Sequence, residues 1–383
     1  MAAEPLAPNP PGREASPPAM LREIYEQPDA IRRTIQSNLT SDAIFPGALQ
    51  PIEEALFAFK KIIIAASGSS RHAGLAGEIM MEDLAGVAVD VEYASEYCYR
   101  STHAGTDPIV LVITQSGETA DTIAAQREAL NRGAKTIAIS NVADSTITRE
   151  ASAALITHAG PEHAIPATKS FTAQLAILYL FSLFLARQRG RLSAQAIRAH
   201  LKSLAEAADG IERSLALWDA QAAECARSWQ QARAFLYLGR SVHYAIAREG
   251  ALKLKEISYV QAEGFPAGEL RHGPNALVDA NTPVIVLAAR DSADPDSLLR
   301  YQKTLGVLEY VKSRGGKAMA VATGEDRDAA ALADCVISVP AAPEVLLPIL
   351  EIVPLQLFAY HFARLNGHDV DHPRNLVKAV ITE

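Results

Sequence analysis

Short apolar runs recur along most of the chain, separated by segments in which apolar residues fall at helical spacing. In the first half these runs cover residues 61–66, 88–93, 109–114, 136–140 and 154–157. Apolar runs are typical of strands buried on both faces, and strands that alternate with helices indicate a parallel, doubly wound sheet. We therefore predict an α/β fold.

The residues before the first strand show a different pattern. Over residues 20–60 charged and apolar residues alternate at helical spacing, with breaks at Pro28, Ser41-Asp42 and Pro46-Gly47. This pattern predicts two or three helices.

The second half of the chain repeats the order of the first. Segments 235–241, 283–288, 315–321 and 335–339 resemble segments 62–69, 108–113, 133–139 and 155–158 in the same order. The displacement of about 175 residues is the size of a domain, so it favours two copies of one fold; chance similarity of generic β/α units is the alternative. The predicted divisions are a tail at 1–19, helices at 20–60, domains at 61–191 and 234–365, a helical connection at 192–233 and a C-terminal tail at 366–383.

Composition and charge narrow the class of protein. The 383 residues are 49% hydrophobic and 21% charged, and the net charge of −8 argues against a large nucleic-acid surface or an electrostatically bound membrane. Residues 1–19 are rich in Ala, Pro and Glu and lack the apolar core of a signal peptide, so we expect a disordered tail on a cytoplasmic protein. The most apolar helical segment, 173–185, is too short to span a bilayer.

The three cysteines lie far apart in the chain. Cys98, Cys225 and Cys335 form no CxxC motif, so the sequence suggests neither a disulfide framework nor a thiolate metal site. We expect all three to be small buried residues.

Two turns have the composition of a phosphate site. The apolar run 109–114 ends in a hydroxyl-rich turn with Gly117 that leads into a helix, and Ser67-Gly68-Ser69-Ser70 follows the run 61–66 in the same way. Ligands of open α/β sheets bind outside the carboxyl ends of strands, so both turns are expected to line one crevice that holds a phosphorylated small molecule. Two ordinary turns with N-capping serines are the alternative. Neither a dinucleotide-binding G-x-G-x-x-G after the first strand nor a P-loop motif is present.

Lysine and carboxylate side chains mark three further candidate positions. Lys169 falls at the start of a predicted helix, where the helix dipole disfavours a cation, so it indicates an anionic partner or an ion pair unless it faces solvent. Glu249, Lys253 and Glu256 fall on one helical stripe, either as a solvated salt-bridged face or, with His272 further along, as groups for proton transfer. The apolar C-terminal tail is expected to dock and to place Lys378 in a cleft, where a lysine can form a Schiff base, or else at the surface.

Together these motifs resemble the sugar isomerase (SIS) family, and within it the isomerase half of the glutamine–fructose-6-phosphate aminotransferases. The resemblance extends over residues 20–383 and implies two tandem SIS domains in a homodimer with shared active sites, with no cofactor and no metal. Its motifs are Ser-Gly-Ser-Ser at 67–70, Gln-Ser-Gly-Glu-Thr-Ala-Asp-Thr at 115–122, Glu-Gly-Ala-Leu-Lys-Leu-Lys-Glu-Ile-Ser-Tyr at 249–259, Gly-Glu-Leu-Arg-His-Gly-Pro at 268–274 and Pro-Arg-Asn-Leu-Val-Lys at 373–378.

The resemblance implies a role for each candidate residue. Glu256 moves a proton between C1 and C2 of the open-chain sugar with help from Lys253, and Lys378 forms an imine with the ketose. His272, supplied by the neighbouring subunit, helps to open the ring. The residues implied in binding the sugar and its phosphate are Gly68, Ser69, Ser70, Thr114, Gln115, Ser116, Thr119, Glu162, Ile165 and Ala167.

Two departures from the family pattern limit what the resemblance implies. Family members with a glutaminase begin with a catalytic cysteine, whereas here Ala2 follows Met1 and no cysteine precedes Cys98, so we expect no glutamine-dependent transfer by this chain alone. Ala167 stands where the synthases carry a serine, which removes a sugar-facing hydroxyl and leaves the identity of the sugar open.

Three functions are compatible with the sequence. The first is an aminosugar-phosphate isomerase and deaminase that interconverts glucosamine 6-phosphate and fructose 6-phosphate plus ammonia. The second is a deglycase or isomerase of another phosphorylated ketosamine. The third is a non-catalytic regulatory module that binds a phosphorylated hexose or hexosamine; the acid–base residues Glu256, His272 and Lys378 disfavour it, because binding alone does not need them.

Overall fold

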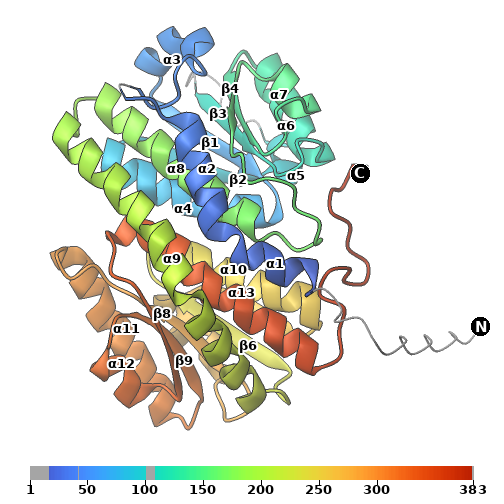
Figure 1. The fold of residues 1–383 in the computed structure, drawn as a ribbon, viewed down its shortest axis with the longest axis vertical. Coiled ribbons are helices and arrows are strands. Elements are labelled where there is room, and N and C mark those ends of the chain that lie inside the picture. Colours follow the sequence, from blue (N-terminus) through green and yellow to red (C-terminus); the bar gives the residue numbers. More distant parts are fainter. Residues whose placement is uncertain (1–16, 42, 101–107, 382–383) are drawn as a thin grey trace, which may run out of the picture.

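Two parallel five-stranded sheets form the framework of the molecule (Figure 1). The structure is a computed structural model that describes residues 17–41, 43–100 and 108–381. The first sheet has the order β2-β1-β3-β4-β5, and every predicted run of the first half is a strand in it. Its strands are β1 (Lys61–Ala66), β2 (Ala88–Tyr93), β3 (Ile109–Ile113), β4 (Lys135–Ser140) and β5 (Ala153–Ile156).

The second sheet repeats the topology of the first. Its order is β10-β9-β8-β6-β7, so β6 takes the place of β1 and β7 that of β2. This confirms the predicted pair of doubly wound α/β sheets. The sequence pattern missed β7, because this edge strand is largely polar or exposed instead of apolar. The strands are β6 (Ala234–Gly239), β7 (Gln261–Pro266), β8 (Val284–Ala288), β9 (Ala318–Thr323) and β10 (Cys335–Val339).

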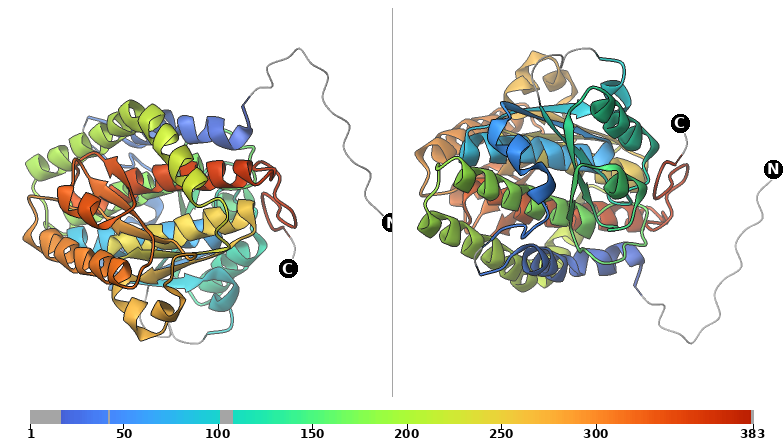
Figure 2. Two further views of the ribbon diagram at one scale, coloured as in Figure 1. Left: turned by 90° about the horizontal axis from the view of Figure 1, so that it is seen from below. Right: turned by 90° about the horizontal axis from the view of Figure 1, so that it is seen from above.

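Helices fill the space between the two sheets and cover their outer faces. Helices α10 and α13 pack side by side through the middle of the molecule, and α10 also packs on α4 of the first half (Figure 2). The outer faces carry α6 and α7 on one sheet and α11 and α12 on the other (Figure 1). The helices of the first half are α1 (Ala19–Tyr25), α2 (Gln27–Asn38), α3 (Glu53–Ala58), α4 (Gly68–Ala85), α5 (Ala94–Tyr97), α6 (Ala120–Asn131), α7 (Thr146–Glu150) and α8 (Lys169–Gln188). The others are α9 (Ala194–Ser228), α10 (Val242–Ser258), α11 (Pro295–Ser313), α12 (Arg327–Leu332) and α13 (Leu347–Leu365), with short 3₁₀ helices η1 (Gln50–Ile52), η2 (Ala267–His272), η3 (Pro274–Leu277) and η4 (Glu344–Leu346).

The structure tests only part of the prediction for the N-terminal segment. Residues 1–16 of the predicted tail lie outside the described residues, and Ala19 already belongs to α1. Helices α1, α2 and α3 occupy the segment in which two or three helices are predicted.

Helix α8 is longer than the sequence pattern suggests. It spans 20 residues, and α8 and the segment Glu344–Leu365 are both long and apolar enough to cross a membrane. The prediction that the apolar segment is too short was therefore wrong. The most apolar windows of the two segments are 94% and 89% buried inside the protein, however, as core helices are.

The cysteine prediction was also wrong. Cys225 on α9 and Cys335 on β10 form a disulfide across 110 residues of sequence, which brings the connecting helix to the second sheet. Only Cys225 is buried, while Cys335 and Cys98, which is not part of this disulfide, are half-buried. The pairing depends on where α9 crosses the sheet, which cysteine spacing does not encode.

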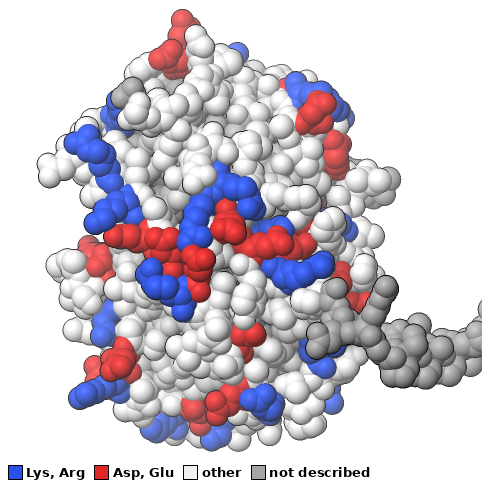
Figure 3. Space-filling model, in the orientation of Figure 1, with Lys and Arg blue, Asp and Glu red and all other residues white. Residues whose placement is uncertain are grey.

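Charged side chains tie the N-terminal helices to the connecting helix. Arg32 on α2 forms ion pairs with Asp209 and Glu212 on α9. On this face of the molecule, basic and acidic side chains intermingle across the middle (Figure 3). The ion pairs link α2, which packs on α8 of the first half, to the helix that leads into the second.

Candidate active site

The two serine-rich turns lie at the same edge of the first sheet. Strands β1 and β3 pair in parallel, so the turns that follow Ala66 and Ile113 leave from neighbouring carboxyl ends. Gly68 has a φ of +54° and begins α4, while Thr119 is the N-cap of α6. The two helix starts therefore lie at one edge of the sheet, where ligands of open α/β sheets bind.

Hydroxyl groups of these turns are partly engaged with one another. Thr114 Oγ1 lies 2.7 Å from Thr119 Oγ1, and Ser116 Oγ accepts a hydrogen bond from the Glu118 backbone N–H at 3.1 Å. Ser70 Oγ accepts one from Gln174 Nε2 of α8 at 3.0 Å. A hydroxyl offers one proton and two lone pairs, so each group keeps bonding capacity for a ligand.

Gly117 sets the shape of the second turn. It has a φ of +73°, and a Cβ there would lie 2.0 Å from Ser145 Oγ, so Gly117→Ala combines backbone strain with a steric clash. We expect it to lower the free energy of unfolding by about 2–4 kcal/mol in urea titrations. Gly133→Ala is the matched control, because Gly133 has a φ of +83° with no neighbouring atom within 4 Å. Equal losses in the two variants would show that contact with Ser145 is unimportant.

The stripe on α10 forms a buried charge cluster. Lys253 Nζ lies 2.6 Å from Glu256 Oε2 and 3.5 Å from Glu249 Oε1. The Lys253 and Glu249 side chains are 1% and 0% exposed, whereas the Glu256 side chain is 20% exposed. A solvated salt-bridged face, the alternative in the sequence, is thereby excluded.

Burial and charge shift the cluster's carboxylates in opposite directions. Burial raises the pKa of Glu256 above its usual value, and the attraction of Lys253 offsets this only in part. Burial also acts to raise the pKa of Glu249, but Lys253 and His72 outweigh it, so that carboxyl stays ionised. For Lys253, burial acts to lower the pKa, but Glu256 and Glu249 outweigh it and raise the pKa. Of the two carboxyls, Glu256 is therefore the better suited to exchange a proton.

The cluster reaches across to the first turn. His72 Nδ1 on α4 lies 2.8 Å from Glu249 Oε2, and the nearby Ser69 hydroxyl also acts to lower the pKa of Glu249. The second half of the chain therefore supplies charged groups next to the first serine-rich turn of the first half. The sequence pattern does not indicate His72 or its contact with Glu249. Both depend on the packing of α4 against α10.

Lys378 belongs to a second charged group at the start of α8. Its Nζ donates to Glu162 Oε2 at 2.6 Å and to the Ala164 carbonyl at 2.7 Å. Glu162 also accepts hydrogen bonds from the Thr168 and Ser170 backbone N–H groups. Burial acts to raise the pKa of Glu162, but Lys378 outweighs it and lowers the pKa. Glu162 thus holds both the helix start and the lysine in place.

The C-terminal tail lies against the first half of the molecule (Figure 1). The Ile165 backbone N–H donates to the Asp371 carbonyl, and the Ala120 N–H at the start of α6 donates to the Val380 carbonyl, both at 3.0 Å. Lys378 is half-buried between these two contacts. The tail thus reaches the start of the same helix that follows the second serine-rich turn.

Lys169, at the start of α8, forms an ion pair and does not face solvent. Its side chain is 3% exposed and pairs with Glu26 at the junction of α1 and α2. The ion pair is confirmed and a solvent-facing lysine is excluded. The cation offsets a carboxylate that the N-terminal helices bring to the start of α8.

Four predicted residues have no contact with the charge cluster among the contacts found in the described part of the chain. His272 is exposed at the end of η2, and no contact found among the described residues joins it to Glu256. Ile165 and Ala167 are half-buried just before Thr168, the N-cap of α8. The half-exposed Gln115 holds the second turn through its carbonyl, which accepts from the Asn141 backbone N–H at 3.1 Å.

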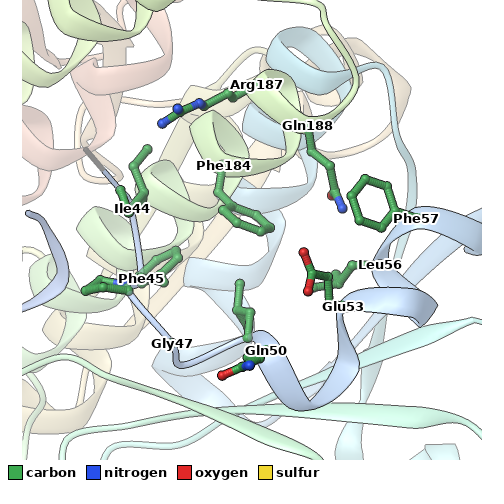
Figure 4. Close-up of a pocket in the computed structure, with 13 residues that line it drawn as sticks. Ile44, Phe45, Gly47, Gln50, Glu53, Leu56, Phe57, Phe184, Arg187 and Gln188 are labelled. Carbon is green, nitrogen blue, oxygen red and sulfur yellow. The ribbon is translucent and has the colours of Figure 1, made fainter.

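A separate cavity of about 490 Å³ lies at the far end of α8 (Figure 4). Ile44, Phe45, Leu56, Phe57 and Phe184 make its wall largely apolar. From Gln174 near the serine-rich turn to Phe184, α8 rises about 15 Å. This cavity is therefore distinct from the region of the serine-rich turns and the charged groups.

Comparisons with known proteins support one family. The SIS domain family matches residues 55–184 and 229–365. The glutamine–fructose-6-phosphate aminotransferase (isomerizing) of Chlorobaculum tepidum is 44% identical over 366 residues, which are 95% of this chain and 58% of the relative. That of Aquifex aeolicus is 42% identical over 364 residues, with coverages of 95% and 58%. The chain thus spans less than two thirds of these relatives.

Solved structures agree with this comparison. The C-terminal domain of glucosamine-fructose-6-phosphate aminotransferase from Francisella tularensis superposes with a TM-score of 0.86 at 35% identity, covering 94% of this chain and 99% of that one. A glucosamine-6-phosphate deaminase from Thermotoga maritima has a TM-score of 0.69 at 21% identity, with coverages of 94% and 99%. The second comparison shows a shared fold alone.

Proposed function

Because this chain belongs to the SIS domain family, we propose that it interconverts glucosamine 6-phosphate and fructose 6-phosphate plus ammonia. The observation that carries the proposal is the buried Glu249–Lys253–Glu256 cluster beside the serine-rich turn that follows β1. A binding module would gain nothing from a glutamate that is only 20% exposed, has a raised pKa and is paired with a buried lysine.

The phosphate of the sugar is assigned to the serine-rich turns. Ser69, Ser70, Ser116 and Thr119 are half-buried and offer hydroxyl groups near two helix starts. Helix starts attract anions through their unpaired N–H groups and the positive end of the helix dipole. With its phosphate there, an open-chain hexose extends towards the charged groups of α10 and the tail.

Glu256 acts as the base in this proposal. It takes the proton from C2 of the open-chain aminosugar and returns it to C1 while a proton passes from the amino nitrogen to O1, which converts the 2-amino aldehyde into a 2-imine with a hydroxyl group at C1. The Lys253 ammonium stabilises the negative charge that develops between these steps. Lys378 then displaces ammonia from C2 to form an imine with the ketose, and water releases fructose 6-phosphate and the free lysine.

We also propose that the protein is a homodimer with shared active sites. His272 is exposed, lies on a short 3₁₀ helix and has no described contact with the charge cluster of its own chain. Placing it in the crevice of a second copy would supply an acid–base group for opening the sugar ring, as the family resemblance implies.

Ammonia release is the direct test of the proposed reaction. We expect the protein to release ammonia from glucosamine 6-phosphate, and borohydride to trap the fructose 6-phosphate imine as a covalent adduct. Lys378→Met should abolish the adduct, because no amine remains to attack C2. Lys202→Met, at an exposed position on α9, is the control and should still be trapped.

A phosphorylated ketosamine is the second candidate substrate. Ala167, beside the start of α8, lacks the hydroxyl group of the serine that the synthases carry at this position. This leaves room for a different substituent on the sugar. An absence of ammonia with glucosamine 6-phosphate, and of exchange with fructose 6-phosphate plus ammonium, would reject the first reaction. Release of the bound amine from another ketosamine phosphate would then identify the second.

A further inference from the structure

A cavity of about 470 Å³ in the second domain is lined by three cationic side chains. Arg240 follows β6, Arg271 lies on η2 and Lys303 lies on α11. Among the described residues no carboxylate lines this cavity. The concentration of positive charge is therefore not balanced within its wall.

These cations also lack acidic partners elsewhere in the described part of the chain. None of the ion pairs found there includes Arg240, Arg271 or Lys303. The Arg240 Nε atom is buried without a hydrogen-bond partner, while the Arg271 guanidinium stacks 4.8 Å from the centre of the Tyr310 ring. A buried donor without an acceptor costs free energy, and a bound anion would satisfy it.

The turn that carries Arg240 is the second domain's counterpart of Ser67-Gly68-Ser69. It follows β6, the strand that occupies the place of β1 in the second sheet. Ser241 has a φ of +49°, and a Cβ at Gly239 would lie 2.4 Å from the His243 carbonyl oxygen. Strained backbone of this kind clusters at binding sites, and open α/β sheets bind ligands outside the carboxyl ends of their strands.

We propose that this cavity is a second phosphate-binding site that accepts a phosphate monoester of a small molecule. Arginine offers a planar pair of N–H donors to phosphate oxygens, and Lys303 adds a point charge. The volume is that of an ordinary small-molecule site. Its wall contains none of the residues assigned to the proposed reaction, although Arg271 directly precedes His272 on η2.

Calorimetric titration of the whole protein with inorganic phosphate at low ionic strength tests this site. Arg240→Gln is expected to weaken one class of phosphate site by about tenfold or more, because a charge-assisted donor is lost. Arg271→Gln combined with Lys303→Gln should have the same effect and alters only exposed residues. Arg314→Gln is the control, since Arg314 also stacks on Tyr310 but does not line the cavity.

The proposal is overturned if phosphate does not bind to the unaltered protein. It is also overturned if Arg240→Gln and the double variant bind phosphate with the same affinity and stoichiometry as the unaltered protein. Binding that is lost in Arg240→Gln and in the double variant but kept in Arg314→Gln supports it. Ammonia release plays no part in this measurement, so failure of the second site and failure of the proposed reaction are distinguishable.

Discussion

Glu256→Gln is expected to lower the turnover of glucosamine 6-phosphate by about 10²–10⁴-fold while leaving its binding almost unchanged. The amide has nearly the shape of the carboxyl but cannot accept a proton, and the loss of a general base typically has an effect of this size. Because burial raises the pKa of Glu256, the unaltered enzyme should also lose activity as that carboxyl becomes protonated on the acid side. Steady-state kinetics and calorimetric binding of the substrate check both parts of the prediction.

Glu224→Gln is the matched control for this change. Glu224 is an exposed carboxylate on α9, away from the cluster, so its removal should alter neither turnover nor binding. If Glu256→Gln turned over substrate at the rate of the control, Glu256 would not be the base. If it lost binding together with turnover, the carboxylate would serve to hold the substrate and not to move a proton.

Lys253→Met is expected to lower the free energy of unfolding by about 3–5 kcal/mol at pH 7, because it leaves two carboxylates buried beside each other without their shared cation. Methionine fills a similar volume, so the loss comes from charge and not from a cavity. Denaturation in urea followed by circular dichroism measures the difference.

The effect of Lys253→Met should depend on pH. Lys253 and His72 hold the pKa of Glu249 below its usual value, so their contribution to stability is present above the unfolded pKa and disappears as the pH falls through the folded one. The difference between the variant and the unaltered protein should therefore shrink below about pH 4.5. Lys255→Met is the control, since Lys255 is exposed two residues along the same helix. An equal loss in the two variants would contradict the role of the buried charges.

The parallel sheets could be predicted well because their strands are buried on both faces. Nine of the ten strands appear as apolar runs, and the repeat of their order predicts two copies of the fold. The tenth, β7, is an edge strand with polar side chains, so no hydrophobic pattern distinguishes it from a loop. The disulfide between Cys225 and Cys335 could not be predicted, because it joins residues 110 positions apart.

The candidate site divides in the same way. The stripe of Glu249, Lys253 and Glu256 is local, since residues three and four positions apart share one face of any helix. The His72–Glu249 contact and the Lys378–Glu162 pair join residues from distant parts of the chain, and no local spacing indicates them. The sequence also does not tell whether the Glu249 stripe faces water or the protein interior. The packing of α4 against α10 decides this.

Local periodicity and turn chemistry are therefore enough to establish the fold class, the two serine-rich turns and the residues able to carry charge. Burial is a property of the assembled protein, and it converts the Glu249 stripe from a possible surface salt bridge into a desolvated cluster with shifted pKa values. The same assembly brings the C-terminal tail and Lys378 to Glu162, and gathers Arg240, Arg271 and Lys303 around one cavity. Electrostatic interactions depend on distance and on exclusion of water, and both arise only when distant segments pack together.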